Sequence, residues 1–252
     1  MHSSNFNILQ WNLNGFYKKL NEMELIIQKQ SPNIICIQES NFNDNLIGKI
    51  PKFNTYYKNR TNALRSSGGV ATFVSDNFYS TQLNLITNLE AIAITIHGKE
   101  IITICNIYLP NQLNFNENDI NKIIKQLPTP YIITGDFNSH NVIWGSISTD
   151  PRGKIIENIL NNDNITLLNT GDNTRLNPHN GNLSAIDLSF SNTTLAQRLL
   201  WSVDSEIHSS DHFPISISII PRIHDNNNVT SFRWNLKNPN WQKYTDALHK
   251  KI

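Results

Sequence analysis

The sequence predicts an α/β fold: a four-layer α/β/β/α sandwich in which two mixed sheets pack face to face and helices lie outside. Three observations lead to this fold class. Short apolar runs that alternate with polar residues recur along the chain, as expected for strands covered on one face. Only a few segments have helical spacing between them, and such a mixture favours packed sheets with outer helices. The 252 residues are enough for one large domain with a sizeable core.

The chain opens with a predicted strand, helix and second strand. Apolar and polar residues alternate over residues 6–12, and a turn containing Gly15 follows. Apolar residues recur at helical spacing over residues 20–30. Residues 33–40 then form a short, mostly apolar strand that ends at Glu39. This order is typical of a βαβ unit, in which the two strands are parallel.

The remaining elements follow from the same two periodicities. Residues 41–68 are polar and irregular. Two alternating runs around Gly98 predict a β-hairpin. Helical spacing recurs over residues 116–127 and 153–163. Further strands are predicted at residues 68–75, 131–138, 164–170, 183–191, 199–207 and 213–220.

The composition changes after Pro221. The next residues are polar and rich in asparagine, and a short amphipathic piece follows them. We therefore expect one domain over residues 1–220. Residues 221–252 are expected to form a C-terminal extension packed back on the domain, or a linker toward a downstream region absent from this sequence.

Charge and cysteine content set broad limits on function. The formal net charge is +1, so a nucleic-acid-binding protein of this composition needs a local basic face. Cys36 and Cys105 lie inside apolar runs and are predicted to be buried free thiols, which suits a reducing compartment. We see no signal-peptide pattern and no run near the ~20 apolar residues of a membrane span. An intracellular protein without a membrane partner is expected.

Polar side chains of types that suit phosphate chemistry occur where the predicted strands end. Asp136, Asn138 and His140 occupy alternate positions at the end of the strand over residues 131–138. A single acid at a strand end is usually a turn former, but similar residues follow several strands, and loops gather at one edge of a sandwich. We expect these residues to meet there; the others are Asn12, Asn14, Glu39, Tyr108, Asn111, Asp187, Asp211 and His212.

The types of these residues fit a phosphodiesterase that uses a metal ion. Glu39 supplies a hard oxygen ligand of the kind that Mg²⁺ prefers, and Asp211 and Asn12 are candidates to complete the shell. Adjacent residues of a strand point to opposite faces, so Asp211 and His212 are expected to have different roles. A catalytic imidazole needs a partner that fixes its tautomer, and Asp187 is the candidate.

Asp136 and Asn138 are two residues apart, so an extended backbone directs both to the same side. One of them is expected to position or deprotonate water, and the other to donate a hydrogen bond to a phosphate oxygen. His140 lies past the end of the strand and is assigned to the loop or to DNA contact.

Six ordered motifs resemble those of the endonuclease/exonuclease/phosphatase superfamily, which includes apurinic/apyrimidinic endonucleases and neutral sphingomyelinases. They are LQWNLNG, CIQE, YLPN, GDFNSH, AIDL and SDHFPI, and together they cover roughly residues 6–220. Three longer stretches resemble the endonuclease domain of jockey-type non-LTR retrotransposons: TGDFNSHNVIWGS, RGKIIENILNNDNITLLNTG and SAIDLSFSN. The tail FRWNLKNPNWQKYTDAL is similar to the segment that leads toward a reverse transcriptase in such elements.

The resemblance implies roles at the metal ion and at the scissile phosphate. Asn12 and Glu39 are implied to lie in the metal site, with Asp211 as a further ligand. Tyr108 and Asn111 are implied to contact the scissile phosphate. The implied cofactor is Mg²⁺ or Mn²⁺.

The same resemblance implies roles in proton transfer. Asp136 is implied to orient or activate water with help from Asn138, while His212, held by Asp187, stabilises the phosphate or shares proton transfer. One position departs from the pattern of apurinic endonucleases, because Asn14 stands where those proteins commonly have an acid. An amide can bind a metal cation but carries no negative charge. Either the affinity for the metal is weakened, or Glu39 and Asp211 neutralise the charge of the cation instead.

The activity implied is nicking of double-stranded DNA, which leaves a 3′-hydroxyl and a 5′-phosphate and primes reverse transcription in the nucleus. The implied partners are DNA and a reverse transcriptase domain of the same polyprotein, with the isolated domain a monomer. A basic rim is expected to contact phosphates, and the loop around Arg175 is a candidate for insertion into a groove. The rim residues are Tyr17, Lys18, Lys19, Arg60, Arg65, Arg175 and His140.

Two alternatives remain open from the sequence. The same machinery suits another phosphoester, such as a lipid or inositol phosphate. A decayed copy that only binds DNA is the third hypothesis, and the filled catalytic positions speak against it.

Overall fold

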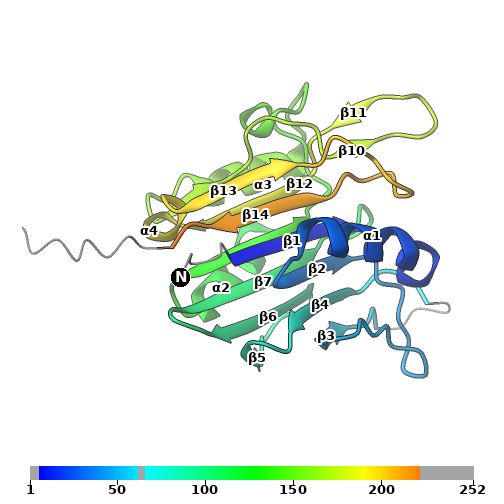
Figure 1. The fold of residues 1–252 in the computed structure, drawn as a ribbon. Coiled ribbons are helices and arrows are strands. Elements are labelled where there is room, and N and C mark those ends of the chain that lie inside the picture. The colour runs from blue at the N-terminus through cyan, green and yellow to red at the C-terminus, as the bar shows by residue number, and fades with distance from the viewer. Residues whose placement is uncertain (1–5, 62–65, 222–252) are drawn as a thin grey trace, which may run out of the picture. The chain divides into compact units, whose positions relative to one another are not determined.

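The computed structural model describes residues 6–61 and 66–221. This part of the chain contains two six-stranded sheets, and a separate two-stranded ribbon extends at one end (Figure 1). The compact unit ends at Pro221. The predicted boundary at residue 220 and the extension over residues 221–252 stay predictions, because residues 222–252 lie outside the described range.

The first sheet is mixed. Its six strands, in spatial order, are β13 (Leu199–Val203), β14 (Ile215–Ile219), β1 (Phe6–Asn12), β2 (Ile34–Gln38), β4 (Val70–Ser75) and β3 (Phe53–Lys58). Strands β1 and β2 are parallel, as the βαβ prediction requires, and the other neighbouring pairs are antiparallel.

The second sheet is also mixed. Its strands, in spatial order, are β5 (Tyr79–Leu83), β6 (Glu90–His97), β7 (Ile101–Tyr108), β8 (Tyr131–Asp136), β12 (Asp187–Asn192) and β9 (Ile165–Leu167). Strands β7 and β8 are parallel, so their carboxyl ends share one edge of the sheet. The ribbon consists of β10 (Arg175–Leu176) and β11 (Leu183–Ser184).

Helices cover the outer faces of both sheets. They are α1 (Leu20–Gln30), α2 (Glu117–Gln126) and α3 (Pro151–Leu160), with 3-10 turns η1 (Phe16–Lys19) and η2 (Val142–Trp144). The short α4 (Thr193–Ala196) instead places Leu195 in the apolar layer between the sheets. Helix α2 begins with a capping box between Asn116 and Asp119. Asp150 caps α3 and Pro151 follows at its first position, where a missing N–H costs nothing.

Three apolar layers confirm the predicted four-layer sandwich. Met23 and Ile26 of α1 pack on the outer face of the first sheet. Ile120 of α2 and Ile156 of α3 pack on the outer face of the second. Between the sheets lies a third layer, which includes Ile8 and Ile104. In Figure 1, α1 lies in front of β1 and β2, while α2 and α3 lie behind the second sheet.

Polar side chains continue this middle layer. Gln10 donates to Gln38 at 2.9 Å and to Asp187 at 3.1 Å, and Gln38 donates to Asn106 at 2.7 Å. These side chains are fully buried. Buried polar groups that bond to one another hold the two sheets in one register, and the network leads directly into the candidate site.

Several details differ from the sequence prediction. Strands β3 and β5 lie in segments that the sequence left unassigned, because their residues are only partly buried edge residues without an apolar run. Cys36 and Cys105 are buried free thiols, as predicted, and burial raises the pKa of Cys36 to about 12. Within residues 6–61 and 66–221, no helix is long and apolar enough to cross a membrane.

Candidate active site

The site is centred on Asp136, the last residue of β8. Gly135 precedes it with φ of 153°, and a Cβ there would lie 1.9 Å from the carbonyl oxygen of Ile107. Only glycine lets the backbone pass so close to β7 at this point. The buried Asp136 carboxylate accepts hydrogen bonds from the backbone N–H of Asn138 at 2.9 Å and from its side-chain amide at 3.0 Å.

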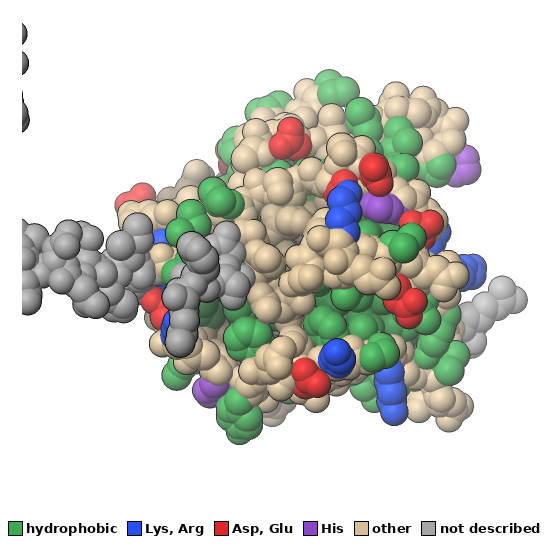
Figure 2. Space-filling model, in the orientation of Figure 1, with side chains coloured by type: hydrophobic (Ala, Val, Ile, Leu, Met, Phe, Trp, Pro, Cys, Tyr) green, Lys and Arg blue, Asp and Glu red, His purple; other side chains and the backbone are tan. Residues whose placement is uncertain are grey.

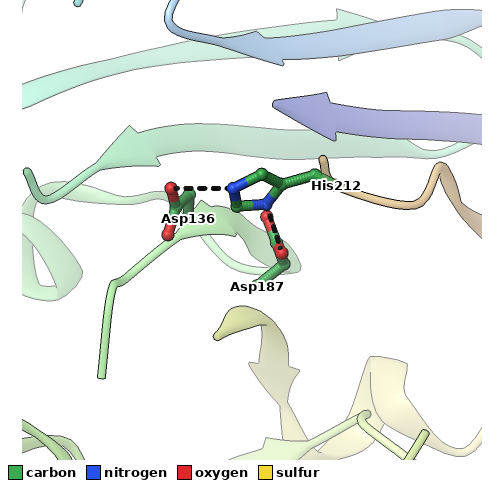
Figure 3. Close-up of side chains that lie close together, drawn as sticks. All are labelled: Asp136, Asp187 and His212. Carbon is green, nitrogen blue, oxygen red and sulfur yellow. Dashed lines mark hydrogen bonds and ion pairs between the residues drawn. The ribbon is translucent and has the colours of Figure 1, made fainter. Parts of the chain in front are cut away.

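Asp187 lies directly opposite Asp136 in the antiparallel pairing of β12 with β8. Its Oδ2 accepts a hydrogen bond of 2.8 Å from Nδ1 of His212, since a carboxylate only accepts. Nε2 of His212 is therefore free to face Asp136, whose Oδ2 lies 3.9 Å away (Figure 3). Asp187 thus fixes the tautomer and orientation of the ring, as the sequence predicted.

The three buried groups shift one another's pKa. Burial raises the pKa of Asp136, against the opposing effects of the His212 charge and of the hydrogen bonds from Asn12 and Asn138. Burial alone would lower the pKa of His212, but the charge and hydrogen bond of Asp187, followed by the charge of Asp136, raise it. These carboxylates favour the cationic form of the imidazole, which suits stabilisation of a phosphate oxygen.

Asn12 joins this cluster to Glu39. Its amide nitrogen donates to Asp136 Oδ2 at 2.8 Å and to Glu39 Oε1 at 3.0 Å, while its oxygen accepts the N–H of Asn14 at 3.0 Å. In this orientation Asn12 holds two carboxylates side by side. The role of Asn12 as a metal ligand stays a prediction. A metal ion would bind its side-chain oxygen, which already accepts the hydrogen bond from Asn14.

Tyr108 completes the edge near Glu39. Burial, followed by the charges of Glu39 and Asp136, raises the pKa of Tyr108 far above its ordinary value. The phenol therefore stays protonated and can donate a hydrogen bond beside two carboxyl groups. The carboxylates of Glu39 and Asp136 both contact the Asn12 amide nitrogen and so lie close together. Carboxylate oxygens are the ligands that a hard divalent ion such as Mg²⁺ prefers.

A second placement for an ion is the set Asp136, Asp187 and His212, whose potential ligand atoms lie within 4.8 Å of one another. We favour the Glu39 edge. Nδ1 of His212 is committed to Asp187 at 2.8 Å, and Mg²⁺ prefers oxygen ligands and retains several waters. The set supplies two carboxylates, but its third ligand is a nitrogen, and its burial leaves little room for water ligands.

Asp211 and Arg175 differ from expectation. Their side chains form an ion pair, with Arg175 Nη2 and Nε at 2.8 and 2.9 Å from Asp211 Oδ2. The sequence predicted a metal ligand and a free DNA-contacting cation instead. Both roles stay predictions, and each now requires this pair to open or to act as a unit. Asp211 still lies close enough to His212 to raise its pKa.

The remaining predicted residues lie outside the hydrogen-bonded cluster. Asn111 is exposed in the turn after β7, and His140 lies in the loop after β8, where its carbonyl accepts the N–H of Asp150. Tyr17 is 44% exposed and packs on Phe16 and Phe42.

The cations of the predicted rim are in different situations. Lys18 is exposed, while Lys19 donates to the carbonyl of Ser209. Arg65 lies outside the described residues. Figure 2 shows Lys and Arg side chains scattered between acidic ones on the face that it presents, without a single basic patch.

Arg152 is a site residue that the sequence did not reveal. Its guanidinium donates to five backbone carbonyls in the two loops that follow β7 and β8; they belong to Leu109, Pro110, Leu113, Phe137 and Asn138. It thereby ties together the loops that carry Asn111 and Asn138. Nothing in the sequence signals this role, since an arginine in the first turn of a helix usually faces solvent.

We expect Arg152→Met to destabilise the fold by about 2–4 kcal/mol, because several carbonyls lose a charged donor. Arg152→Lys should recover only part of this, since an ammonium cannot reach both loops at once. Urea unfolding measures the effect. Lys154→Met, on the exposed side of the same helix, is the matched control, and equal stability of Arg152→Met and this control would contradict the assignment.

Comparisons with known proteins agree with this geometry. Residues 102–216 match the family described as Endonuclease-reverse transcriptase. A probable RNA-directed DNA polymerase from transposon X-element of Drosophila melanogaster is 25% identical over 217 residues, which cover 84% of this chain and 24% of that protein. The RNA-directed DNA polymerase from mobile element jockey of Drosophila funebris is also 25% identical, over 81% of this chain and 23% of its own length.

Solved structures share the fold. The endonuclease domain of TRAS1, a telomere-specific non-LTR retrotransposon, superposes with a TM-score of 0.72 at 22% identity, covering 86% of this chain and 99% of its own. An AP endonuclease from Leishmania major gives 0.68 at 12% identity, over 87% of this chain and 89% of its own.

The described part of the chain therefore has the fold of the TRAS1 endonuclease domain and of the AP endonuclease from Leishmania major. In sequence, the chain is similar to the RNA-directed DNA polymerases of transposon X-element and mobile element jockey, which confirms the resemblance seen in the motifs. The chain spans about a quarter of the length of the curated relatives it matches.

Proposed function

We propose that the chain is a divalent-metal-dependent DNA endonuclease that nicks double-stranded DNA and leaves a 3′-hydroxyl and a 5′-phosphate. The observation that carries the proposal is one continuous set of contacts from Glu39 through Asn12 and Asp136 to His212 and Asp187. These residues lie in β1, directly after β2, in β8, in β12 and in the loop before β14, yet they meet at one edge of the sandwich.

Each group then has a defined task in phosphodiester hydrolysis. Glu39, together with neighbouring oxygens, would hold the ion, which neutralises charge that develops on the phosphoryl oxygens. Asp136 orients the attacking water and accepts its proton as the bond between phosphorus and the 3′-oxygen breaks, and that oxygen takes a proton from solvent to leave as the 3′-hydroxyl. His212 and Tyr108 donate to phosphate oxygens, where added charge needs preorganised donors.

The role in a retroelement rests on the relatives. Their names describe RNA-directed DNA polymerases, and we propose that the 3′-hydroxyl at the nick primes reverse transcription by a reverse transcriptase domain of the same polyprotein. A protein that nicks chromosomal DNA must reach it, so we place the activity in the nucleus. The isolated domain is proposed to act as a monomer.

Supercoiled plasmid is the first test of the proposal. With Mg²⁺ or Mn²⁺, the purified domain should convert supercoiled DNA to the open-circular form, and EDTA should stop the reaction. Labelling of the ends should find a 3′-hydroxyl and a 5′-phosphate. DNA binding without nicking would favour a decayed copy, and release of phosphate from inositol or lipid phosphates without nicking would favour the other phosphoesterase.

Salt dependence tests the proposed basic rim near α1. We expect Lys18→Gln to lower the slope of log affinity against log salt by about one unit, since each phosphate contact contributes about 0.9. Lys19→Gln should have a smaller effect, because Lys19 already contacts the Ser209 carbonyl. Lys29→Gln, near the other end of α1, is the control. Identical slopes for Lys18→Gln and this control would remove Lys18 from the interface.

A further inference from the structure

Arg60 occupies a built position beside the candidate site. Its Nε donates to Glu90 Oε1 at 2.6 Å, in a pair whose side chains are 29% and 12% exposed. Gly68, with φ of 67°, makes room for it, because a Cβ there would lie 2.3 Å from Arg60 Nη2. The N–H of Gly69 donates to the second oxygen of Glu90. Three segments thus hold one guanidinium in place.

The guanidinium faces Tyr108. In the pairing of β6 with β7, Glu90 lies opposite Tyr108, and the central carbon of the Arg60 guanidinium lies 5.7 Å from the centroid of the Tyr108 ring. That distance is within the range of a cation–π contact. Nη2 of Arg60 is buried and has no hydrogen-bond partner among the described residues.

The Tyr108 ring therefore lies between opposite charges. Its hydroxyl is beside the carboxylates of Glu39 and Asp136, and the Arg60 cation lies against the ring. A phenol that donates to a phosphate oxygen must hold one orientation while that phosphate gains charge. A cation that is itself held by Glu90 and lies against the ring restricts the orientations that Tyr108 can adopt.

We infer that Arg60 is a positioning residue for Tyr108, held by Glu90, and that it acts on the turnover step rather than on DNA affinity. This inference rests on the proposed nuclease function. It differs from a place for Arg60 in a DNA-binding rim, because a phosphate contact would act mainly on affinity and on its salt dependence.

A double-mutant cycle tests the inference on the purified domain. We expect Arg60→Met to lower kcat for nicking about tenfold with KM little changed, as for partners that orient a catalytic group. If Arg60 acts only by orienting the Tyr108 hydroxyl, it has no effect once that hydroxyl is removed. The double variant Arg60→Met with Tyr108→Phe should therefore nick no more slowly than Tyr108→Phe alone. Glu90→Gln should reproduce part of the Arg60→Met effect, and Arg60→Lys should restore part of kcat.

Lys58→Met is the matched control, since Lys58 is the last residue of β3, two residues before Arg60, and donates to the carbonyls of Thr87 and Leu89. This control should leave kcat within about twofold of wild type. Fully additive losses, or an effect on KM and salt slope alone, would overturn the inference while the nuclease function stands. A wild-type protein that nicks no DNA with any divalent ion would overturn the proposed function and the inference together.

Discussion

Replacing Asp136 with asparagine is expected to lower the nicking rate by at least about 100-fold, the usual cost of losing one well-placed catalytic group. The amide cannot accept a proton from water. It also turns a donor toward Asn12 or Asn138, both of which now donate to this carboxylate. Single-turnover nicking of plasmid at saturating protein measures the effect.

The fold should survive this change, because Asp136 is a buried anion and its neutral isostere removes a desolvation cost. Circular dichroism and urea unfolding check this point. Asp172→Asn, at an exposed loop acid, is the control for loss of a negative charge. If the Asp136→Asn protein nicked DNA as fast as the Asp172→Asn protein, Asp136 would have no part in the chemistry.

His212→Ala is expected to have an effect of similar size, about 100-fold or more on the nicking rate. The ring is nearly fully buried, its Nδ1 is held by Asp187, and its Nε2 faces Asp136. His208 offers a matched control in the same loop: it packs on Trp11 and contacts Glu22 at 3.3 Å. If His208→Ala and His212→Ala lost activity equally, the loop as a whole, rather than the His212 ring, would be responsible.

The raised pKa of His212 also predicts a dependence of stability on pH. A group whose pKa is higher in the folded state stabilises the fold below its unfolded pKa of about 6.5, and this stabilisation is lost as pH rises through its folded pKa of about 9. Urea unfolding of wild type should therefore show falling stability between these values. His212→Ala should lack that part of the slope, and parallel profiles for the two proteins would contradict the shift.

Most of the fold was predictable because it depends on local periodicity. The alternation of β1 and of the β6–β7 hairpin marks strands wherever one face is buried. Edge strands such as β3 gave no such signal, because its residues are only partly buried or exposed. Its place in the sheet is set by pairing with β4, which local sequence does not encode.

The sequence predicted part of the candidate site, and it did not predict several of the contacts there. Asp187 was assigned to His212 from residue chemistry, and the structure brings them to 2.8 Å. The Arg175–Asp211 pair joins residues 36 positions apart through long side chains, and Arg152 binds backbone carbonyls rather than another side chain. Interactions of this kind follow from loop conformation, so residue type and spacing carry no trace of them.

The most direct measurement is anomalous diffraction from a crystal of the domain with Mn²⁺ and a short duplex. The prediction is one Mn²⁺ peak within ligand distance of the Glu39 carboxylate, with a backbone phosphate between it and Nε2 of His212. A peak enclosed by Asp136, Asp187 and His212, or a phosphate bound elsewhere on the sandwich, would contradict the proposal that these side chains share one phosphorus and one ion.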